Sequence, residues 1–170
     1  KYCGVNKRLY QRNKGLESYA YSFIHEDKPE ELFNMKFDVI IGNPPYQMED
    51  GGNARSASPI YNLFVEQAKK LKPRYLSMII PSRWFAGGKG LNNFRKEMLT
   101  DNRIEKIFDY ENSSDVFPGV EIAGGVCFFL WNAGYAGDCE VTNMSNKDIK
   151  TNLRKLDEFP IFIRRASTVS

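Results

Sequence analysis

Hydrophobic residues gather into short runs along the chain, and polar segments rich in Gly, Pro, Asn and Asp separate these runs. Apolar, aromatic and β-branched residues dominate five runs that we predict as strands: 19–25, 37–41, 75–80, 104–110 and 122–131. Two other segments carry apolar residues at the spacing of one helix face, and we predict them as helices: 59–72, with Ser58 as the N-cap, and 91–99. This alternation predicts an α/β fold.

The run 37–41 ends in an abrupt change of sequence character. Its last three residues are all β-branched, which predicts a strand buried on both faces, as in a parallel sheet. A glycine and the motif Asn43-Pro44-Pro45-Tyr46 follow directly. We therefore expect the motif at the carboxyl end of a strand, where open α/β sheets bind their ligands.

The residue types of this motif suit the binding of a planar amine. Each proline fixes its own φ and keeps the preceding residue extended, so the motif is stiff. The side chain of Asn43 and the carbonyl of Pro44 can converge as two hydrogen-bond acceptors, and the ring of Tyr46 can stack on a base, worth about 1–3 kcal/mol. Accepting both N–H bonds of an aromatic amine frees its lone pair to attack an electrophilic methyl group without a strong general base.

The ten residues 37–46, FDVIIGNPPY, resemble the catalytic motif of amino-group DNA methyltransferases, in particular the N6-adenine methylases of restriction-modification systems. The resemblance implies S-adenosylmethionine as the cofactor, double-stranded DNA with a flipped adenine as the substrate, and Asn43, Pro44, Pro45 and Tyr46 as catalytic residues. Glutamine side chains and RNA bases are alternative substrates, because their methylases share the motif. A noncatalytic nucleic-acid-binding module with a degenerate methylase fold is a further alternative.

The resemblance also implies contacts to the methyl donor. In the family, an acidic residue at the end of the preceding strand contacts the adenine ring of S-adenosylmethionine. Asp27 matches this place after the predicted strand 19–25, with Glu26 as the alternative. Asn43 is the second predicted donor contact. The alternative roles for Asp27 and Glu26 are solvated turn residues or a cap in the first turn of the next segment.

Candidate substrate contacts besides Tyr46 follow from the same resemblance. Arg83 and Trp84 come directly after a predicted strand and are candidate contacts to DNA or to the flipped base. Their alternative roles are an ion pair and an aromatic residue at the edge of the core. Phe117 precedes the last predicted strand, where the family places an apolar residue near the target base.

The last two predicted strands, 104–110 and 122–131, are joined by a segment with no predicted helix, so we expect them to pair antiparallel. A mostly parallel sheet with a C-terminal antiparallel hairpin is similar to the Rossmann-like fold of S-adenosylmethionine-dependent methyltransferases. The family's glycine-rich donor loop, however, lies upstream of the catalytic motif. Only Gly4, Gly15 and Gly42 precede Asn43, and none of them forms a Gly-x-Gly turn.

We therefore expect a part of an N6-adenine DNA methyltransferase of a restriction-modification system. Residues 1–145 are expected to form the catalytic half of the methyltransferase domain, with 1–18 as an irregular lead-in. Residues 146–170 are expected to lead toward a target-recognition region that this segment lacks.

Composition narrows this picture only a little. The net charge of +3 over 170 residues permits nucleic-acid binding but does not argue for it. Cys3, Cys127 and Cys139 are widely spaced and His25 is the single histidine, so we expect no metal site and no disulfide framework. This cysteine usage predicts a cytoplasmic protein. No apolar run approaches the length that spans a membrane.

Overall fold

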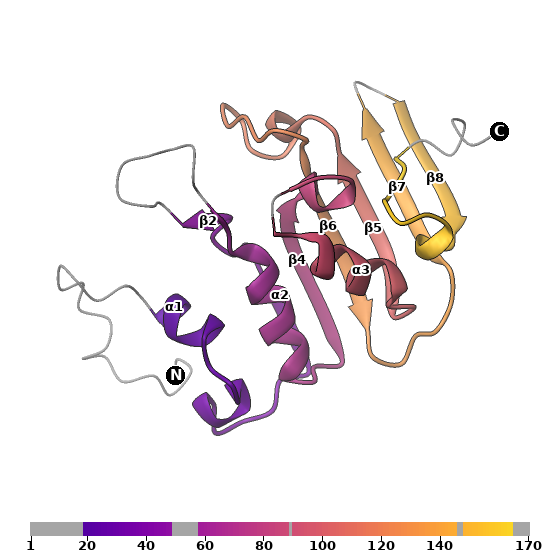
Figure 1. The fold of residues 1–170 in the computed structure, drawn as a ribbon. Helices are drawn as coiled ribbons and strands as arrows, with labels where there is room; N and C mark the ends of the chain where they lie inside the picture. The colour runs from indigo at the N-terminus through magenta and orange to yellow at the C-terminus, as the bar shows by residue number, and fades with distance from the viewer. Residues whose placement is uncertain (1–18, 49–57, 89, 146–147, 165–170) are drawn as a thin grey trace.

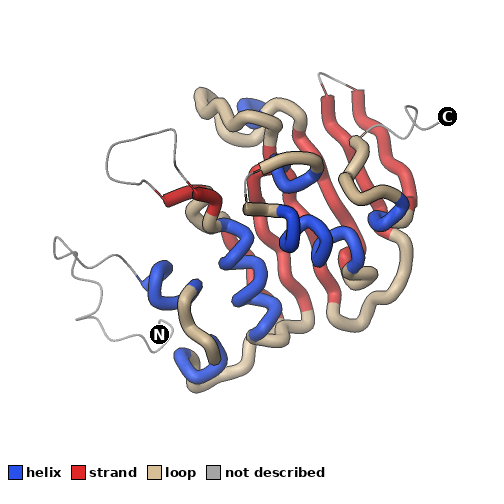
Figure 2. The backbone as a smooth tube through the Cα atoms, viewed as in Figure 1, coloured by secondary structure: helices blue, strands red, loops and turns tan. Residues whose placement is uncertain are grey.

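The structure, a computed structural model, describes residues 19–48, 58–88, 90–145 and 148–164. The predicted lead-in 1–18 lies outside these residues. Within them, a six-stranded sheet forms one layer, and Figures 1 and 2 show helices lying along one side of it. This arrangement confirms the predicted α/β class.

The sheet is mixed rather than mostly parallel. Its strands in spatial order are β1 (Val39–Gly42), β4 (Tyr75–Pro81), β6 (Val126–Asn132), β5 (Ile104–Tyr110), β7 (Cys139–Ser145) and β8 (Asp148–Arg154). Strands β1 and β4 pair parallel, as do β5 and β7, whereas the pairings of β6 with β4 and with β5 and of β7 with β8 are antiparallel. The predicted antiparallel pairing of β5 with β6 is confirmed. The antiparallel strand β6 lies inside the sheet, between β4 and β5, and not at the end of the sheet.

Strands β1, β4, β5 and β7 run in the same direction, so their carboxyl ends meet at one edge of the sheet. We call this edge the carboxyl edge and the opposite one the amino edge. In Figure 1 the arrowheads of β4, β5 and β7 point to the carboxyl edge. The residues that follow these four strands are therefore neighbours in space.

Helices connect and cover the strands. The α-helices are α1 (Tyr19–Ile24), α2 (Tyr61–Lys70) and α3 (Asn92–Thr100), and the 3₁₀ turns are η2 (Pro29–Leu32), η3 (Ser82–Phe85), η4 (Ser113–Asp115) and η5 (Leu156–Glu158). A short bridge joins β2 (Gln47–Met48) to β3 (Ser58–Pro59). Among the helices of the described residues, none has the length and apolar character needed to cross a membrane.

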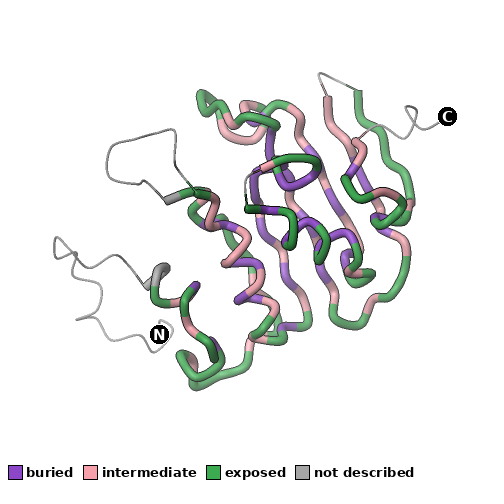
Figure 3. The backbone as a smooth tube through the Cα atoms, viewed as in Figure 1, coloured by how far each residue is buried: buried purple, intermediate pink, exposed green. Residues whose placement is uncertain are grey.

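The hydrophobic core lies between the sheet and helices α2 and α3. Alternate strand residues point into it, and Leu76, Ile80, Ile107, Phe129 and Val141 are all completely buried. Figure 3 shows this alternation along the central strands. Burial in these strands thus alternates with a period of two, the period that a strand covered on one face is expected to show.

The opposite face of the sheet carries apolar side chains with much less cover. Ile41 of β1 is 77% exposed, and Val39, Ile149 and Leu153 are also exposed. The helices drawn in Figure 1 lie on the other side of the sheet, and β1 has only β4 as a neighbour among the described strands. The prediction that this strand is buried on both faces is therefore wrong for the part of the chain that the structure describes.

The first predicted strand, 19–25, is instead the helix α1. Aromatic content favours a strand, but contacts with α2 decide the conformation. The ring of Phe23 packs 6.0 Å from that of Phe64, and Gln67 Nε2 donates hydrogen bonds to the carbonyls of Phe23 (2.7 Å) and Glu26 (2.6 Å). These bonds satisfy carbonyls at the end of α1 that have no partner within the helix.

Helix α2 begins at Tyr61 rather than at Pro59, and Ser58 does not cap it. Pro59 pairs with Gln47 in the β2–β3 bridge, and the N–H of the next residue donates to Tyr46 O at 3.2 Å. The chain therefore folds back on the proline motif before the helix starts. This fold-back brings Tyr46 against the first turn of α2.

The predicted strand 122–131 is shorter at its start, because Gly124 and Gly125 have φ values of +88° and +79°. A Cβ at Gly125 would overlap the carbonyls of Tyr110 and Glu111. Strand β6 begins only after this turn.

The C-terminal part of the chain adds more strand than the sequence predicts. The sequence of residues 139–142 also predicts a strand, at an edge of the sheet. These residues belong to β7, which lies inside the sheet because β8 pairs with its outer side. The segment 146–170, predicted as an exit, contains β8 and η5. Strand β8 was missed because six of its seven residues are exposed and its sequence is largely polar.

Candidate active site

The proline motif lies at the carboxyl edge, directly after β1, as predicted. Asn43 and Pro45 are exposed, whereas Pro44 is buried. The buried proline anchors the turn, and the two exposed residues face solvent. The amide of Asn43 is therefore accessible to a ligand.

Tyr46 is fixed by its neighbours on one side. Its ring meets the ring of Tyr61 edge to face at 6.5 Å and an interplanar angle of 83°. Its hydroxyl is buried and has no hydrogen-bond partner among the described residues. Burial, with a smaller effect of Cys127, raises the pKa of Tyr46 to about 12, so the side chain is a neutral phenol at physiological pH. Such a ring can stack on a base but is no general base.

Tyr61, the first residue of α2, packs against Tyr46 and was not predicted as a site residue. It is 2% exposed, and its ring packs edge to face on Phe94 at 6.0 Å. Burial raises its pKa as well. Tyr61 and Val65, four residues apart on α2, are both buried, so helical spacing signals the burial of Tyr61 but not its contact with Tyr46.

Arg83 and Trp84, the two predicted substrate contacts after β4, differ in their exposure to solvent. Both lie in η3 at the carboxyl edge, and Arg83 is exposed. Trp84 is completely buried, with its ring 4.7 Å from that of Phe85 and 5.9 Å from that of Phe94. A side chain without exposed surface offers no stacking face to a base. Trp84 therefore packs in the core beneath η3.

Phe117 lies in the loop between β5 and β6, at the same edge. Ser113 organises this loop: its Oγ donates to Val120 O and accepts from Ile122 N, both at 2.8 Å. Its carbonyl also accepts from the N–H of Phe117 at 2.8 Å. The loop is joined to the end of β4 because Ser82 N donates to the carbonyl of Gly125 at 3.0 Å. The structure thus brings the loops after β1, β4 and β5 to one edge.

Asp27 is not brought to this edge. It is exposed and follows α1, whose last carbonyls bind Gln67. Gln67 lies about 9 Å along α2 from Tyr61, toward the amino edge. The reason is that 19–25 is a helix, so no strand end exists at Asp27 or Glu26.

A buried carboxylate, Asp109, lies at the carboxyl edge and was not predicted. It accepts hydrogen bonds from Ser82 Oγ (3.0 Å), Asn143 Nδ2 (3.1 Å) and Arg164 Nη2 (3.0 Å). Burial raises the pKa of this carboxyl, whereas Arg164 opposes the rise. Among the described residues, no group of three His, Cys, Asp or Glu side chains lies close enough to hold a metal ion.

Comparison with known sequences finds similarity to methylases in two independent ways. Residues 2–117 match the family described as Eco57I restriction-modification methylase. A protein of Mycoplasma pneumoniae named as an uncharacterized adenine-specific methylase is 39% identical over 164 residues, an alignment that covers 89% of this chain and 39% of that protein. The chain therefore spans about two fifths of the length of this relative.

Comparison with solved structures supports the fold. The methyltransferase subunit of a type I restriction-modification system from Streptococcus thermophilus superposes with a TM-score of 0.52 at 14% identity, over 77% of this chain and 31% of that chain. The type IIG restriction endonuclease BpuSI gives a TM-score of 0.51 at 17% identity, over 71% of this chain and 19% of that chain. At these identities the likeness shows a shared fold.

Proposed function

Because the chain belongs to the Eco57I restriction-modification methylase family, we propose that it forms the amine-binding half of a DNA methyltransferase that acts on N6 of adenine. The observation that carries this proposal is the position of the motif Asn43-Pro44-Pro45-Tyr46. It follows β1 at the carboxyl edge, with Tyr46 braced against α2.

In this proposal the motif holds the target amine. Asn43 Oδ1 and the carbonyl of Pro44 accept the two N–H bonds of N6, so that its lone pair is directed out of the ring plane. Pro45 has no N–H that could compete for these acceptors. The carbonyl dipoles also stabilise the positive charge that the nitrogen gains as it is methylated. No general base is required of Tyr46, in agreement with its raised pKa.

The target base has to leave the duplex to reach this edge, at a cost of a few kcal/mol. Tyr46 then offers a stacking face, and Phe117 lies in a loop at the same edge, where it can contact the base. In this proposal Arg83 contacts DNA, and its exposure supports this role. Trp84 shapes the region through packing alone.

We propose S-adenosylmethionine as the source of the electrophilic methyl group. Of the two predicted donor contacts, Asn43 lies at the carboxyl edge and Asp27 does not, so the described residues do not complete a donor site. An upstream segment of the whole protein fits this gap. It would add a strand beside β1 and cover the face on which Val39 and Ile41 are exposed.

Domain organisation and location follow from this reading. Residues 1–145 are then the amine-binding half of the methyltransferase domain, and the residues after 145 lead toward a target-recognition region. A cytoplasmic location is supported by Cys127 and Cys139, which are free thiols in the core.

The test is methyl transfer from labelled S-adenosylmethionine to unmethylated DNA, by the whole protein that contains this chain. We expect label in N6-methyladenine, a loss of at least about 100-fold in Asn43→Ala, and a smaller loss in Tyr46→Ala. Tyr46→Phe keeps the ring and should stay within about threefold of the wild type. Asn93→Ala, an exposed asparagine on α3, is the matched control.

Three outcomes would contradict the proposal in different ways. Label in RNA or in a glutamine side chain would keep the amine site but change the substrate. Donor binding without any transfer would favour a noncatalytic nucleic-acid-binding module. Transfer that survives Asn43→Ala would remove the proposed role of the motif.

A further inference from the structure

Asp109 connects three separate parts of the chain at the carboxyl edge. Its side chain has no exposed surface. Ser82 from η3 and Arg164 from the C-terminal segment bind Oδ1, and Asn143 from β7 binds Oδ2. In addition, Arg164 Nε forms an ion pair with Oδ2 at 2.7 Å, so the guanidinium faces both carboxylate oxygens.

Arg164 carries these contacts onward to the neighbouring loop. Its Nη2 donates to the carbonyl of Gly124, at the end of the β5–β6 loop, and its guanidinium lies 5.3 Å from the centre of the Phe85 ring. Two residues earlier, Phe162 N donates to Phe85 O at 2.7 Å, and the two rings lie 4.3 Å apart. The segment 162–164 is therefore fastened across η3 and the start of β6.

The fastened elements are those that bear the substrate contacts of the proposed site. Arg83 belongs to η3, and the loop that ends at Gly124 contains Phe117. Aromatic contacts continue from this segment to the proline motif through consecutive ring pairs: Phe162–Phe85, Phe85–Trp84, Trp84–Phe94, Phe94–Tyr61 and Tyr61–Tyr46. A shift of segment 162–164 would thus displace η3 and, through these ring contacts, Tyr46.

We propose that Asp109 and Arg164 are positioning residues for methyl transfer: together they hold η3 and the β5–β6 loop in place beside the proline motif. This inference rests on the proposed function. Asp109 touches no substrate because it is fully buried, so its effect passes through the elements it binds.

Stability alone gives little reason for this pair. Removing a carboxylate and a guanidinium from water is costly, and apolar replacements of such pairs are often neutral or stabilising. What an apolar pair cannot reproduce is the geometry. Three hydrogen bonds and one ion pair to Asp109 fix the distances between η3, β7 and the C-terminal segment.

The experiment compares Arg164→Gln, Arg164→Lys and Asp109→Asn in the whole protein, with steady-state methyl transfer and amide hydrogen exchange as readouts. We expect kcat to fall about 10- to 100-fold, because small displacements of substrate-binding groups cost this much, while KM for the donor changes less than twofold. Exchange should accelerate at the amides of Ser82, Gly125 and Phe162. Arg164→Lys should recover only part of kcat, since lysine cannot face both oxygens.

Asp101→Asn, at the amino edge, is the matched control and should leave kcat unchanged. The Arg164 variants decide the result if Asp109→Asn fails to fold, because the Arg164 side chain is 26% exposed and easier to replace. Wild-type kcat in both Arg164 variants, or unchanged exchange at the three amides, overturns the inference. Absence of transfer by the wild-type protein is a different result, because it overturns the proposed function and the positioning role with it.

Discussion

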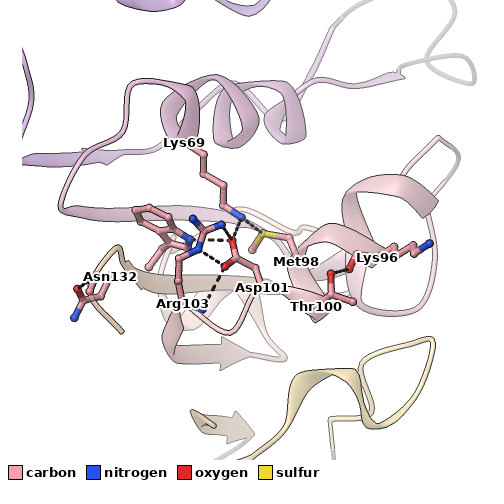
Figure 4. A network of polar contacts seen from close by, with 9 residues as sticks. Lys69, Lys96, Met98, Thr100, Asp101, Arg103 and Asn132 are labelled. Carbon is pink, nitrogen blue, oxygen red and sulfur yellow. Dashed lines mark hydrogen bonds and ion pairs between the residues drawn. The ribbon is translucent and has the colours of Figure 1, made fainter. Parts of the chain in front are cut away.

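The two edges of the sheet each hold one aspartate in a polar cluster, and the two clusters differ in kind. At the amino edge, Asp101 accepts hydrogen bonds from Lys69 Nζ (2.9 Å), Arg103 Nε (2.7 Å) and Trp131 Nε1 (2.9 Å). Figure 4 shows Lys69 of α2 and Arg103 converging on this carboxylate. At the carboxyl edge, Asp109 is fully buried and faces one arginine.

The difference appears in the pKa of each carboxyl group. Although partial burial acts to raise the pKa of Asp101, the hydrogen bonds from Arg103, Lys69 and Trp131 outweigh it and hold the pKa well below its usual range. Burial of Asp109 outweighs its single cation and raises its pKa. The amino edge therefore gains stability from its charge, whereas the carboxyl edge retains a charge that contributes little stability. The amino-edge cluster therefore acts mainly on stability, and the carboxyl-edge cluster fits the positioning role proposed above.

The largest effect that separates the two edges should come from glycines. Gly125→Ala at the carboxyl edge forces a Cβ into the carbonyls of Tyr110 and Glu111 at a φ of +79°, and we expect it to lower the free energy of unfolding by about 3–4 kcal/mol. Gly134→Ala at the amino edge meets only an ordinary contact and should cost less than about 1 kcal/mol. Urea unfolding of both variants measures this, and equal losses would contradict it.

The next effect concerns Asp101. Asp101→Asn keeps the shape of the side chain but removes the charge that Lys69 and Arg103 share, so we expect a loss of about 2 kcal/mol, moderated by partial exposure. Thermal unfolding measures the loss, and methyl transfer at a permissive temperature should be unchanged. A fall in kcat would show that the amino edge also serves the site.

A smaller effect is expected from pH. The pKa of Asp101 is lower in the folded than in the unfolded chain, where it is about 3.9, so its contribution is complete above that value and is lost as the pH falls below it. The stability difference between wild type and Asp101→Asn should therefore shrink from pH 5 to pH 2. Asp109 has the opposite sign, because its raised pKa favours the folded state as acid is added. A pH-independent difference would exclude this role for Asp101.

The smallest effect belongs to a single cation of the amino-edge cluster. Lys69→Met keeps an unbranched apolar side chain but removes the ammonium group 2.9 Å from Asp101. We expect a loss of about 1 kcal/mol, because Arg103 and Trp131 remain. Unfolding in 0.1 M and 1 M salt checks the cause, since salt should reduce the difference.

The sequence predicted those features of the fold and the site that depend on local patterns. Strands β4 and β5 and helix α3 were located to within about one residue, because each strand is one apolar run and the helix is one apolar stripe, bounded by polar residues. The proline motif was placed correctly because residue type and strand end coincide within ten residues. These features are local, so the sequence states them directly.

The features that were missed depend on partners far along the chain. Asp109 and Arg164 are 55 residues apart, and neither is unusual in its own segment. The segment 19–25 has aromatic content that suits a strand, and Gln67 of α2 binds the carbonyls at its end as a helix. Tyr61 became a neighbour of Tyr46 only through the fold-back at Ile60. No local pattern encodes these contacts.

The open side of β1 has a consequence for handling the protein. Val39 and Ile41 are exposed on a strand whose outer backbone groups have no neighbouring strand among the described residues. Such a strand is a template for intermolecular pairing, so this segment produced without the rest of its protein should aggregate as its concentration rises. A charge on the strand opposes this pairing, and Ile41→Lys should delay the onset of light scattering. For the same reason, the strand that we propose beside β1 should raise the yield of dispersed protein when it is supplied by co-expression.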